Sequence, residues 1–372
     1  MGRRGWVAPI VRQRCPPCPQ VNPCRAAAPR TARQRRTDLP GRRRPGPGDI
    51  RRRHAAGGRT VPLVTITVRP FRPADARDVC ELRRRVLPYE ISTAQSVAWE
   101  VAEAPAGKKL RVFVAETGGR VVGVVKSSVR HDSSTPGQGV VVPLVDPGYR
   151  GRGAGSALLA VAEEHLAGLG ATHLHAYPQD DPRSMSFARH RGYRPLRTAR
   201  CLRLDLVRAA LPPLPASLPP GTELRTAADF GADPRPLYEA DAEVMLDEPD
   251  DLTVDAMTYE DWITQTWERP NIDLDLTTVV TVGGEVASFC LAGTDGWGRY
   301  GSGMTGTRRS HRGRGLARLA KTASLHRARE AGCTDAFTVN DAENGPMLAI
   351  NTAFGYRPFG VEWHSVRDLA DA

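Results

Sequence analysis

Two short segments of this chain combine arginine with glycine in a pattern that suits a phosphate group. Residues 150–155 read Arg-Gly-Arg-Gly-Ala-Gly, and residues 312–317 read Arg-Gly-Arg-Gly-Leu-Ala. Each segment follows a run with strand character and precedes a run with helical spacing. Glycine lets the backbone approach a ligand closely, the free N–H groups at a helix N-terminus attract anions, and arginine adds charge-assisted hydrogen bonds. The pattern therefore predicts a diphosphate site in each segment.

A second signal repeats together with the first. The tetrapeptide Gly-Tyr-Arg-Pro occurs at 192–195 and again at 355–358, and it follows the start of the arginine-glycine segment by 42 residues in the first copy and by 43 in the second. Two signals that keep their order and spacing indicate a duplicated domain. One function must therefore be sought in two places.

The elements around the two segments follow one plan, which predicts an α+β fold for each half. In the first half the periodicity predicts a strand at 64–69, a helix at 74–86, a hairpin over 112–129, strands at 140–145, 172–177 and 200–206, and helices at 158–169 and 184–190. In the second half it predicts a hairpin over 278–291, strands at 302–307 and 336–340, and helices at 316–331 and 346–353. In this reading the strand at 200–206 completes the first half.

Composition divides the chain into four parts. Residues 207–221 contain five prolines, which indicates a semi-rigid linker. Residues 1–60 hold 16 arginines, no lysine and two acids, whereas the remainder is nearly neutral. Such a tail cannot bury enough apolar surface to order itself, so we expect a disordered tail at 1–61. The expected domains are 62–208 and 222–372, joined by a linker at 209–221.

Several classes of function are not expected. The basic charge belongs to the tail, so we do not expect the folded part of the chain to bind nucleic acid. No apolar run reaches the ~20 residues of a membrane helix, and we expect a cytoplasmic protein, either a monomer or a homodimer. Cys15, Cys18 and Cys24 lack a fourth ligand at zinc-site spacing, so no metal is expected.

Other glycine-loop chemistries fit the segments less well. A dinucleotide-binding fold would carry an acidic residue ~20 positions on, where this chain has Ala-Thr-His-Leu-His at 171–175. The lysine followed by serine or threonine of a nucleotide-hydrolase loop is absent from both segments. An RNA-binding arginine-glycine tract would be repetitive, not enclosed by a strand and an amphipathic helix.

Both halves resemble GNAT-superfamily N-acetyltransferase domains, and the tandem arrangement resembles that of the mycothiol-synthase type. In that family Arg/Gln-x-x-Gly-x-Gly/Ala follows the fourth strand and cradles the pyrophosphate of acetyl-CoA, and a Gly-Phe or Gly-Tyr pair follows about 40 residues later. Residues 150–155 and 312–317 match the first motif, and Gly192-Tyr193 and Gly355-Tyr356 match the second. The resemblance implies a mixed central sheet flanked by helices in each domain.

The resemblance also implies which residues hold acetyl-CoA, the co-substrate. In the first half they are Val142, Leu144, Val145, Arg150, Gly151, Arg152, Gly153, Ala154 and Gly155. In the second half they are Met304, Gly306, Thr307, Arg312, Gly313, Arg314, Gly315, Leu316, Ala317, Asn340 and Asn344.

The chain departs from the family at the catalytic acid. The family's thiolate-protonating Tyr lies four residues before the Gly of the Gly-Phe/Tyr pair, where this chain has Ala188 and Asn351. Asn351 is a candidate because its amide can hydrogen-bond the sulfur or hold a water. Asp295 and His364 are candidates for the general base. The polar second half is expected to carry the chemistry, and the first to hold CoA or serve a structural role.

The function expected from the resemblance is transfer of an acetyl group from acetyl-CoA to an amine, by direct attack on the thioester. The acceptor is expected to be a small molecule, and the acidic residues between Asp241 and Asp261 would suit a cationic amine. The alternative is an acyl-CoA-binding protein in which one or both domains are catalytically inactive.

Overall fold

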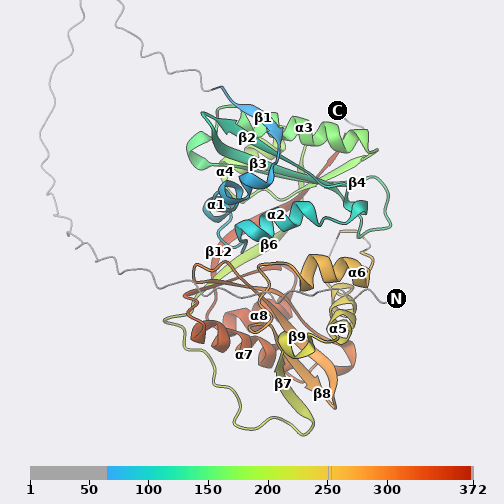
Figure 1. Cartoon of the computed structure of the whole chain (residues 1–372), viewed down its shortest axis with the longest axis vertical. Helices are drawn as coiled ribbons and strands as arrows, with labels where there is room; N and C mark the ends of the chain where they lie inside the picture. The colour runs from blue at the N-terminus through green and yellow to red at the C-terminus, as the bar shows by residue number, and fades with distance from the viewer. Residues whose placement is uncertain (1–64, 250, 253, 370–372) are drawn as a thin grey trace, which may run out of the picture. The chain divides into compact units, whose positions relative to one another are not determined.

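The computed structural model describes residues 65–249, 251–252 and 254–369, and the expected disordered tail lies outside this part of the chain. The described residues form one mixed sheet of twelve strands flanked by helices (Figure 1). The strand order is β1-β2-β3-β4-β5-β12-β6-β11-β10-β9-β8-β7. The strands of the first half are β1 (Thr67–Pro70), β2 (Arg111–Thr117), β3 (Arg120–Val129), β4 (Gln138–Val145), β5 (His173–Ala176) and β6 (Arg194–Asp205). Those of the second half are β7 (Thr222–Thr226), β8 (Thr278–Val282), β9 (Glu285–Thr294), β10 (Arg299–Thr307), β11 (Asp335–Asp341) and β12 (Arg357–Asp368).

The helices cover both faces of the sheet in each half. They are α1 (Ala76–Val86), α2 (Ala94–Ala102), α3 (Ala154–Gly168), α4 (Pro182–Arg189), α5 (Arg235–Met245), α6 (Tyr259–Trp262), α7 (Leu316–Glu330) and α8 (Gly345–Ala353). Buried residues of α1 and α2 pack with Val112, Val114 and Val124, whereas α3 packs with Val125 and Val141 from the opposite face. The pattern follows from the alternation of side chains along each strand. In the second half, α5 and α6 pack on one face and α7 on the other.

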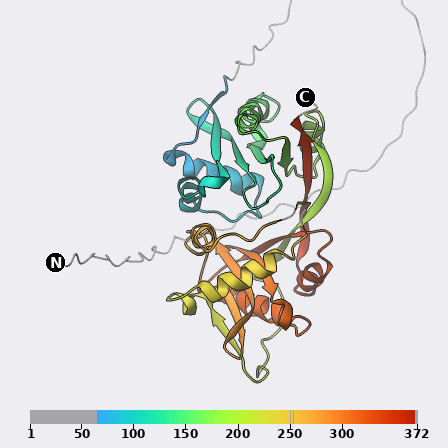
Figure 2. The ribbon, with the colours of Figure 1, turned by 90° about the vertical axis from the view of Figure 1, so that its right-hand side faces the viewer.

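The last strands of the two halves are exchanged. The strand predicted at 200–206 is present within β6, but it pairs with β11 and β12 of the second half. The edge of β5 that it would have covered pairs instead with β12, from His173 opposite Asp368 to Ala176 opposite Ser365. The expectation that this strand completes the first half was therefore wrong. Figure 2 shows β6 and β12 running side by side.

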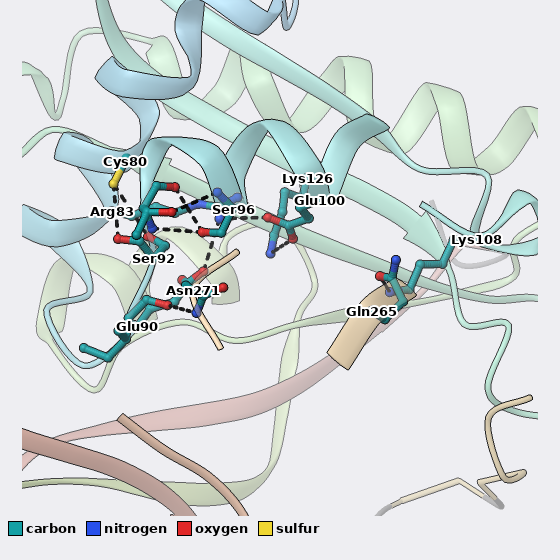
Figure 3. A network of polar contacts seen from close by, with 12 residues as sticks. Cys80, Arg83, Glu90, Ser92, Ser96, Glu100, Lys108, Lys126, Gln265 and Asn271 are labelled. Atoms are coloured by element: carbon teal, nitrogen blue, oxygen red, sulfur yellow. Dashed lines mark hydrogen bonds and ion pairs between the residues drawn. The ribbon is translucent and has the colours of Figure 1, made fainter. Parts of the chain in front are cut away.

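A buried polar network connects α1, α2 and β3 (Figure 3). The guanidinium of Arg83, whose side chain is 2% exposed, lies 2.8 Å from the Glu100 carboxylate, and Lys126 Nζ lies 2.8 Å from its other oxygen. Burial alone would raise the pKa of Glu100, but Lys126 and Arg83 hold this pKa well below its usual range. The network extends toward the second half, where Asn271 Nδ2 donates to the Ile91 carbonyl at 3.0 Å.

Replacing Arg83 with methionine is expected to lower the free energy of unfolding by about 3–5 kcal/mol, because Glu100 keeps a buried charge with one partner fewer. Urea denaturation measures this loss. Because the pKa of Glu100 is depressed in the folded state, the stability from its ionised form is present above its ordinary pKa of 4.5 and is lost as the pH falls below that value. The exposed pair Arg77–Glu81 is the control, and Arg77→Ala should change stability by less than about 1 kcal/mol. Equal effects of the two variants would contradict the prediction.

Candidate active site

The glycine loop of the first half lies between β4 and α3. Asp146 accepts a hydrogen bond from Gly148 N at 2.9 Å and turns the chain away from the strand. Gly151 and Gly153 then adopt left-handed φ values of 76° and 90°, and α3 begins at the next residue, Ala154. A Cβ on Gly153 would meet no atom within 4 Å, so the space above the helix N-terminus is open. This is the geometry of an anion site.

A cavity begins where two parallel strands part. β4 and β5 pair only from Gln138 to Val140, and beyond Val140 they diverge. A cavity of about 790 Å³ lies between them and extends to the glycine loop. The residues lining it include Val142, Leu144, Val145, Arg150, Gly151, Gly153, Gly155, Leu159, Tyr177, Gln179, Arg183, Phe187, Ala188 and Tyr193. Most of the candidate residues from the first half thus meet around one cavity.

Two candidate residues of the first half point elsewhere. The guanidinium of Arg152 lies over the ring of Tyr149, 5.3 Å from its centroid. Ala154 is 1% exposed and packs in the core beneath α3. Neither is among the residues that line the cavity.

The second half repeats the loop geometry with different side chains. β10 and β11 pair only from Arg299 to Gly301 and then diverge, and α7 begins at Leu316 after Gly315, whose φ is 74°. β10 also carries a register shift between Ser302 and Thr305 against β9, whereas β4 keeps a regular register with β3. Such a bulge disrupts the ladder locally and leaves backbone groups unpaired. Unpaired backbone N–H and C=O groups can form hydrogen bonds with a ligand.

Buried polar atoms gather where β10 and β11 diverge. Asn351 on α8 is fully buried and its Nδ2 donates to Asn340 Oδ1 at 2.7 Å, while its own Oδ1 has no hydrogen-bond partner in the described part of the chain. Ser302 Oγ and the Tyr356 hydroxyl are also buried without a hydrogen bond of standard geometry there, although Ser302 lies close enough to oppose the rise in the pKa of Tyr356. Burial raises the pKa of Tyr356 far above its ordinary value. Unpaired buried polar atoms are rare in folded proteins and indicate a functional site or an ordered water.

The loop arginines of the second half have protein partners. Asp247, just beyond α5, pairs with both Arg309 and Arg312. Glu243 on α5 pairs with Arg308 at 2.8 Å and accepts from Arg309 N at 2.6 Å. Two members of the acidic stretch expected to attract a cationic amine are thus used in ion pairs. Arg309 and Arg312 are about half exposed, and exposed ion pairs contribute little to stability. Breaking these pairs so that the arginines can bind a phosphate therefore costs little free energy.

The remaining candidates of the second half have structural contacts. Asn344 caps α8, with its Oδ1 accepting from Met347 N at 3.2 Å. Thr307 O accepts from Arg312 Nε, and Arg314 contacts His311. Met304 packs in the core beneath α5, and a Cβ on Gly306 would collide with Val244 of that helix. Gly313 has a φ of 75°, Leu316 is buried, and Ala317 is half-buried.

The two candidate bases lie in different surroundings. Asp295 is 6% exposed, and its oxygens accept from Trp297 N, Arg299 N and Arg299 Nε, which indicates a turn-forming role. His364 belongs to β12 and stacks on Tyr177, 5.2 Å between ring centroids. Tyr177 lines the first-half cavity, whereas His364 does not line it and contacts it through the Tyr177 ring.

Sequence reasoning missed a second polar group beside the first-half cavity. Gln179, which lines the cavity, donates to the Tyr89 hydroxyl at 2.5 Å, and that hydroxyl donates to Glu362 at 3.0 Å. Burial raises the pKa of both Tyr89 and Glu362. Tyr89 and Glu362 are 273 residues apart and meet only because β12 crosses into the first half, so no sequence signal could have joined them.

Comparison with known proteins decides the family. Residues 77–193 match the acetyltransferase (GNAT) family. These residues of the chain therefore form a GNAT acetyltransferase domain. Mycothiol acetyltransferase of Nocardioides sp. is 28% identical over 226 residues, which span 57% of this chain and 75% of the relative.

Solved GNAT structures extend the likeness to both halves. A GCN5-related N-acetyltransferase from Sphaerobacter thermophilus matches with a TM-score of 0.60 and 21% identity, over 82% of this chain and 95% of the other. A tandem GNAT protein from the clavulanic acid biosynthesis pathway matches with a TM-score of 0.60 and 22% identity, over 82% and 98%. The predicted fold class, two tandem GNAT domains, is thereby confirmed.

Two further features of the described residues bear on the site. They contain no group of three or more His, Cys, Asp or Glu side chains placed to hold a metal ion. Among the helices described, none has the length and apolar character needed to cross a membrane.

Proposed function

We propose that this GNAT acetyltransferase moves an acetyl group from acetyl-CoA to the amine of a small molecule. The observation that carries the proposal is the 790 Å³ cavity between β4 and β5, which ends at the helix N-terminus of α3. Its apolar length suits a pantetheine arm, and Arg150 and Arg183 at its lining suit phosphate groups. The first half accordingly holds acetyl-CoA.

The second half carries the chemistry in this proposal. Where β10 and β11 diverge, the β10 bulge offers backbone groups to a thioester, and the buried polar atoms nearby include Asn351 Oδ1 and the Tyr356 hydroxyl. The amine nitrogen attacks the carbonyl carbon, the carbon–sulfur bond breaks, and the electron pair passes to sulfur. Backbone N–H groups beside the bulge stabilise the oxyanion of the intermediate.

The acceptor, the compartment and the domain limits belong to the same proposal. A small-molecule acceptor is favoured by the relative named for mycothiol. Four cysteines of the described chain, Cys80, Cys201, Cys290 and Cys333, are free thiols, which suits the cytoplasm. The domains are taken as 62–208 and 222–372, and their terminal strands are exchanged.

Release of free thiol tests the function. The full-length protein is mixed with acetyl-CoA and a panel of amines comprising aminoglycosides, amino-acid derivatives, polyamines and an N-terminal peptide. Thiol release well above hydrolysis with one of the small molecules is the expected result. Selective release with the peptide would contradict a small-molecule acceptor. Tight acetyl-CoA binding without amine-dependent release would instead favour the acyl-CoA-binding alternative.

Asn351→Ala is expected to lower turnover by at least about 10-fold, equivalent to about 1.4 kcal/mol in the barrier, because the second-half site loses an amide that can orient water or the sulfur. Steady-state kinetics with the responsive amine measure this. Asn344→Ala is the matched control, since it removes the cap of α8 and should cost about 1 kcal/mol of stability with a smaller change in turnover. Equal kinetic losses in both variants would indicate that α8, not the Asn351 amide, is responsible.

A further inference from the structure

Lys321 on α7 is a buried cation that has no carboxylate partner in the described part of the chain. The residue is 1% exposed, and its Nζ makes no hydrogen bond or ion pair with any described residue. The nearest ring is that of Tyr356, whose centroid lies 5.2 Å from Nζ. Lysine is almost never fully buried unless it is paired, because an isolated ammonium loses its hydration without compensation. The burial of this ammonium therefore suggests a functional role.

The register of the duplication matches Lys321 to a residue that lines the first-half cavity. Counted from the start of each glycine loop, Lys321 corresponds to Leu159, and Leu159 lines the first-half cavity. Counted back from the Gly-Tyr pair, Asn351 corresponds to Ala188, another residue lining that cavity. The positions that are apolar around the first cavity are therefore an ammonium and an amide in the second half.

The surroundings of Lys321 contain weak acids but no carboxylate partner. The titratable groups buried on this side of the sheet are Cys290 on β9, Tyr300 on β10, Cys333 after α7 and Tyr356 before β12. Thr305, at the end of the β10 bulge, donates to Cys290 Sγ at 3.3 Å, so the bulge and the lysine share a neighbour. Burial lowers the pKa of Lys321 to about 8, with Cys290 opposing the shift. Both protonation states are thus accessible near neutral pH.

We propose that Lys321 donates the proton to the departing CoA sulfur in the second half. This assignment rests on the proposed function of that half. As the carbon–sulfur bond breaks, the electron pair moves to sulfur and the ammonium proton of Lys321 follows it, which gives the free thiol and a neutral lysine. The acceptor nitrogen loses one proton as the amide forms, so lysine regains a proton and the turnover balances.

The other polar side chains of the proposed second-half site are poorer proton donors. The Asn351 amide has no proton that it can give up near neutral pH. The Tyr356 hydroxyl has its pKa raised far above that of an ordinary thiol, ~8.5, so transfer from it to a thiolate is uphill. Transfer from the Lys321 ammonium is close to balanced, which is the condition for efficient general acid catalysis.

The test compares Lys321→Met with the wild type in kcat and KM between pH 6 and pH 10. The wild-type kcat should fall as the pH rises through the pKa of Lys321, since the donor must be protonated. In Lys321→Met we expect kcat about 100-fold lower, KM for acetyl-CoA within about 3-fold, and no such alkaline fall. Lys321→Arg should stay slow, because arginine keeps its proton. The exposed Lys109→Met should retain wild-type kcat within a few-fold.

The outcomes separate this inference from the proposed function. Folding should survive, because the substitution removes an uncompensated buried charge, and Lys321→Leu, which installs the residue found in the first half, provides a second variant. Wild-type kcat in Lys321→Met, a loss that leaves the alkaline limb unchanged, or full activity in Lys321→Arg would each overturn the assignment. A wild-type enzyme that releases no thiol with any amine would refute the proposed function instead.

Discussion

Replacing Gly153 with glutamate is expected to weaken acetyl-CoA binding by the first half about 100-fold, and the same replacement at Gly315 is expected to weaken binding by the second half and so to lower turnover. Both glycines hold left-handed φ values, 90° and 74°, directly before α3 and α7. A Cβ at either position faces open space, so the new carboxylate would lie where the diphosphate has to bind. Repulsion between like charges at this point should weaken binding by about 100-fold, or ~2.8 kcal/mol.

Calorimetry and turnover measured on the same variants provide the test. Gly153→Glu should lose the first-half binding event and keep turnover within about 3-fold, whereas Gly315→Glu should lose turnover. Gly153→Ala carries the strain of a left-handed residue without the carboxylate, and Gly168→Glu places the same charge on an exposed glycine of ordinary φ beside open space. Unchanged affinity in both glutamate variants would refute the loop assignment. Loss of turnover only with Gly153→Glu would move the chemistry to the first half.

Cutting the linker is expected to leave the two halves associated. After cleavage at a protease site inserted between Ala216 and Ser217, β6 remains with the first fragment and β12 with the second. β6 pairs with β11 from Ala199 to Asp205, and β12 pairs with both β5 and β6. Separation would break these ladders and expose their buried side chains together, so we expect no dissociation at micromolar concentration.

Size-exclusion chromatography after cleavage, in native buffer and in urea, measures this. The cut protein should elute at the position of the uncut protein in native buffer and separate into two fragments only when denatured. The uncut protein with the inserted site is the control. Two separate native peaks would mean that each half completes its own sheet and that the strand exchange is wrong.

The sequence alone determined the repeating features. The glycine loops, the helices that follow them and the Gly-Tyr turns at 192 and 355 are local signals, since each depends on residues adjacent in the chain. Glycine at a left-handed position and apolar residues at helical spacing can be recognised without knowing the neighbours in space. The first half's loop and strand residues, Val142 to Gly155, were for the same reason placed near the cavity that they line.

Some elements gave weaker signals and were missed. Helices α2, α5 and α6 and strand β7 were not predicted. Helix α6 is only four residues long, and α2 owes its start to a capping box of Thr93 with Ser96 that precedes a short, mixed helix. Short elements are stabilised mainly by packing against the rest of the fold, so their own sequence carries little information.

Only the tertiary structure decided which strand pairs with which, and therefore which side chains meet. The apolar pattern of β6 identifies a strand but not its partner, because backbone hydrogen bonds are the same for every neighbour. The exchange of β6 and β12 brings Glu362 to Tyr89 and His364 to Tyr177. Burial likewise exists only in the fold. In sequence Lys321 is one lysine in an amphipathic helix, and only the packing of α7 against the sheet removes its ammonium from water.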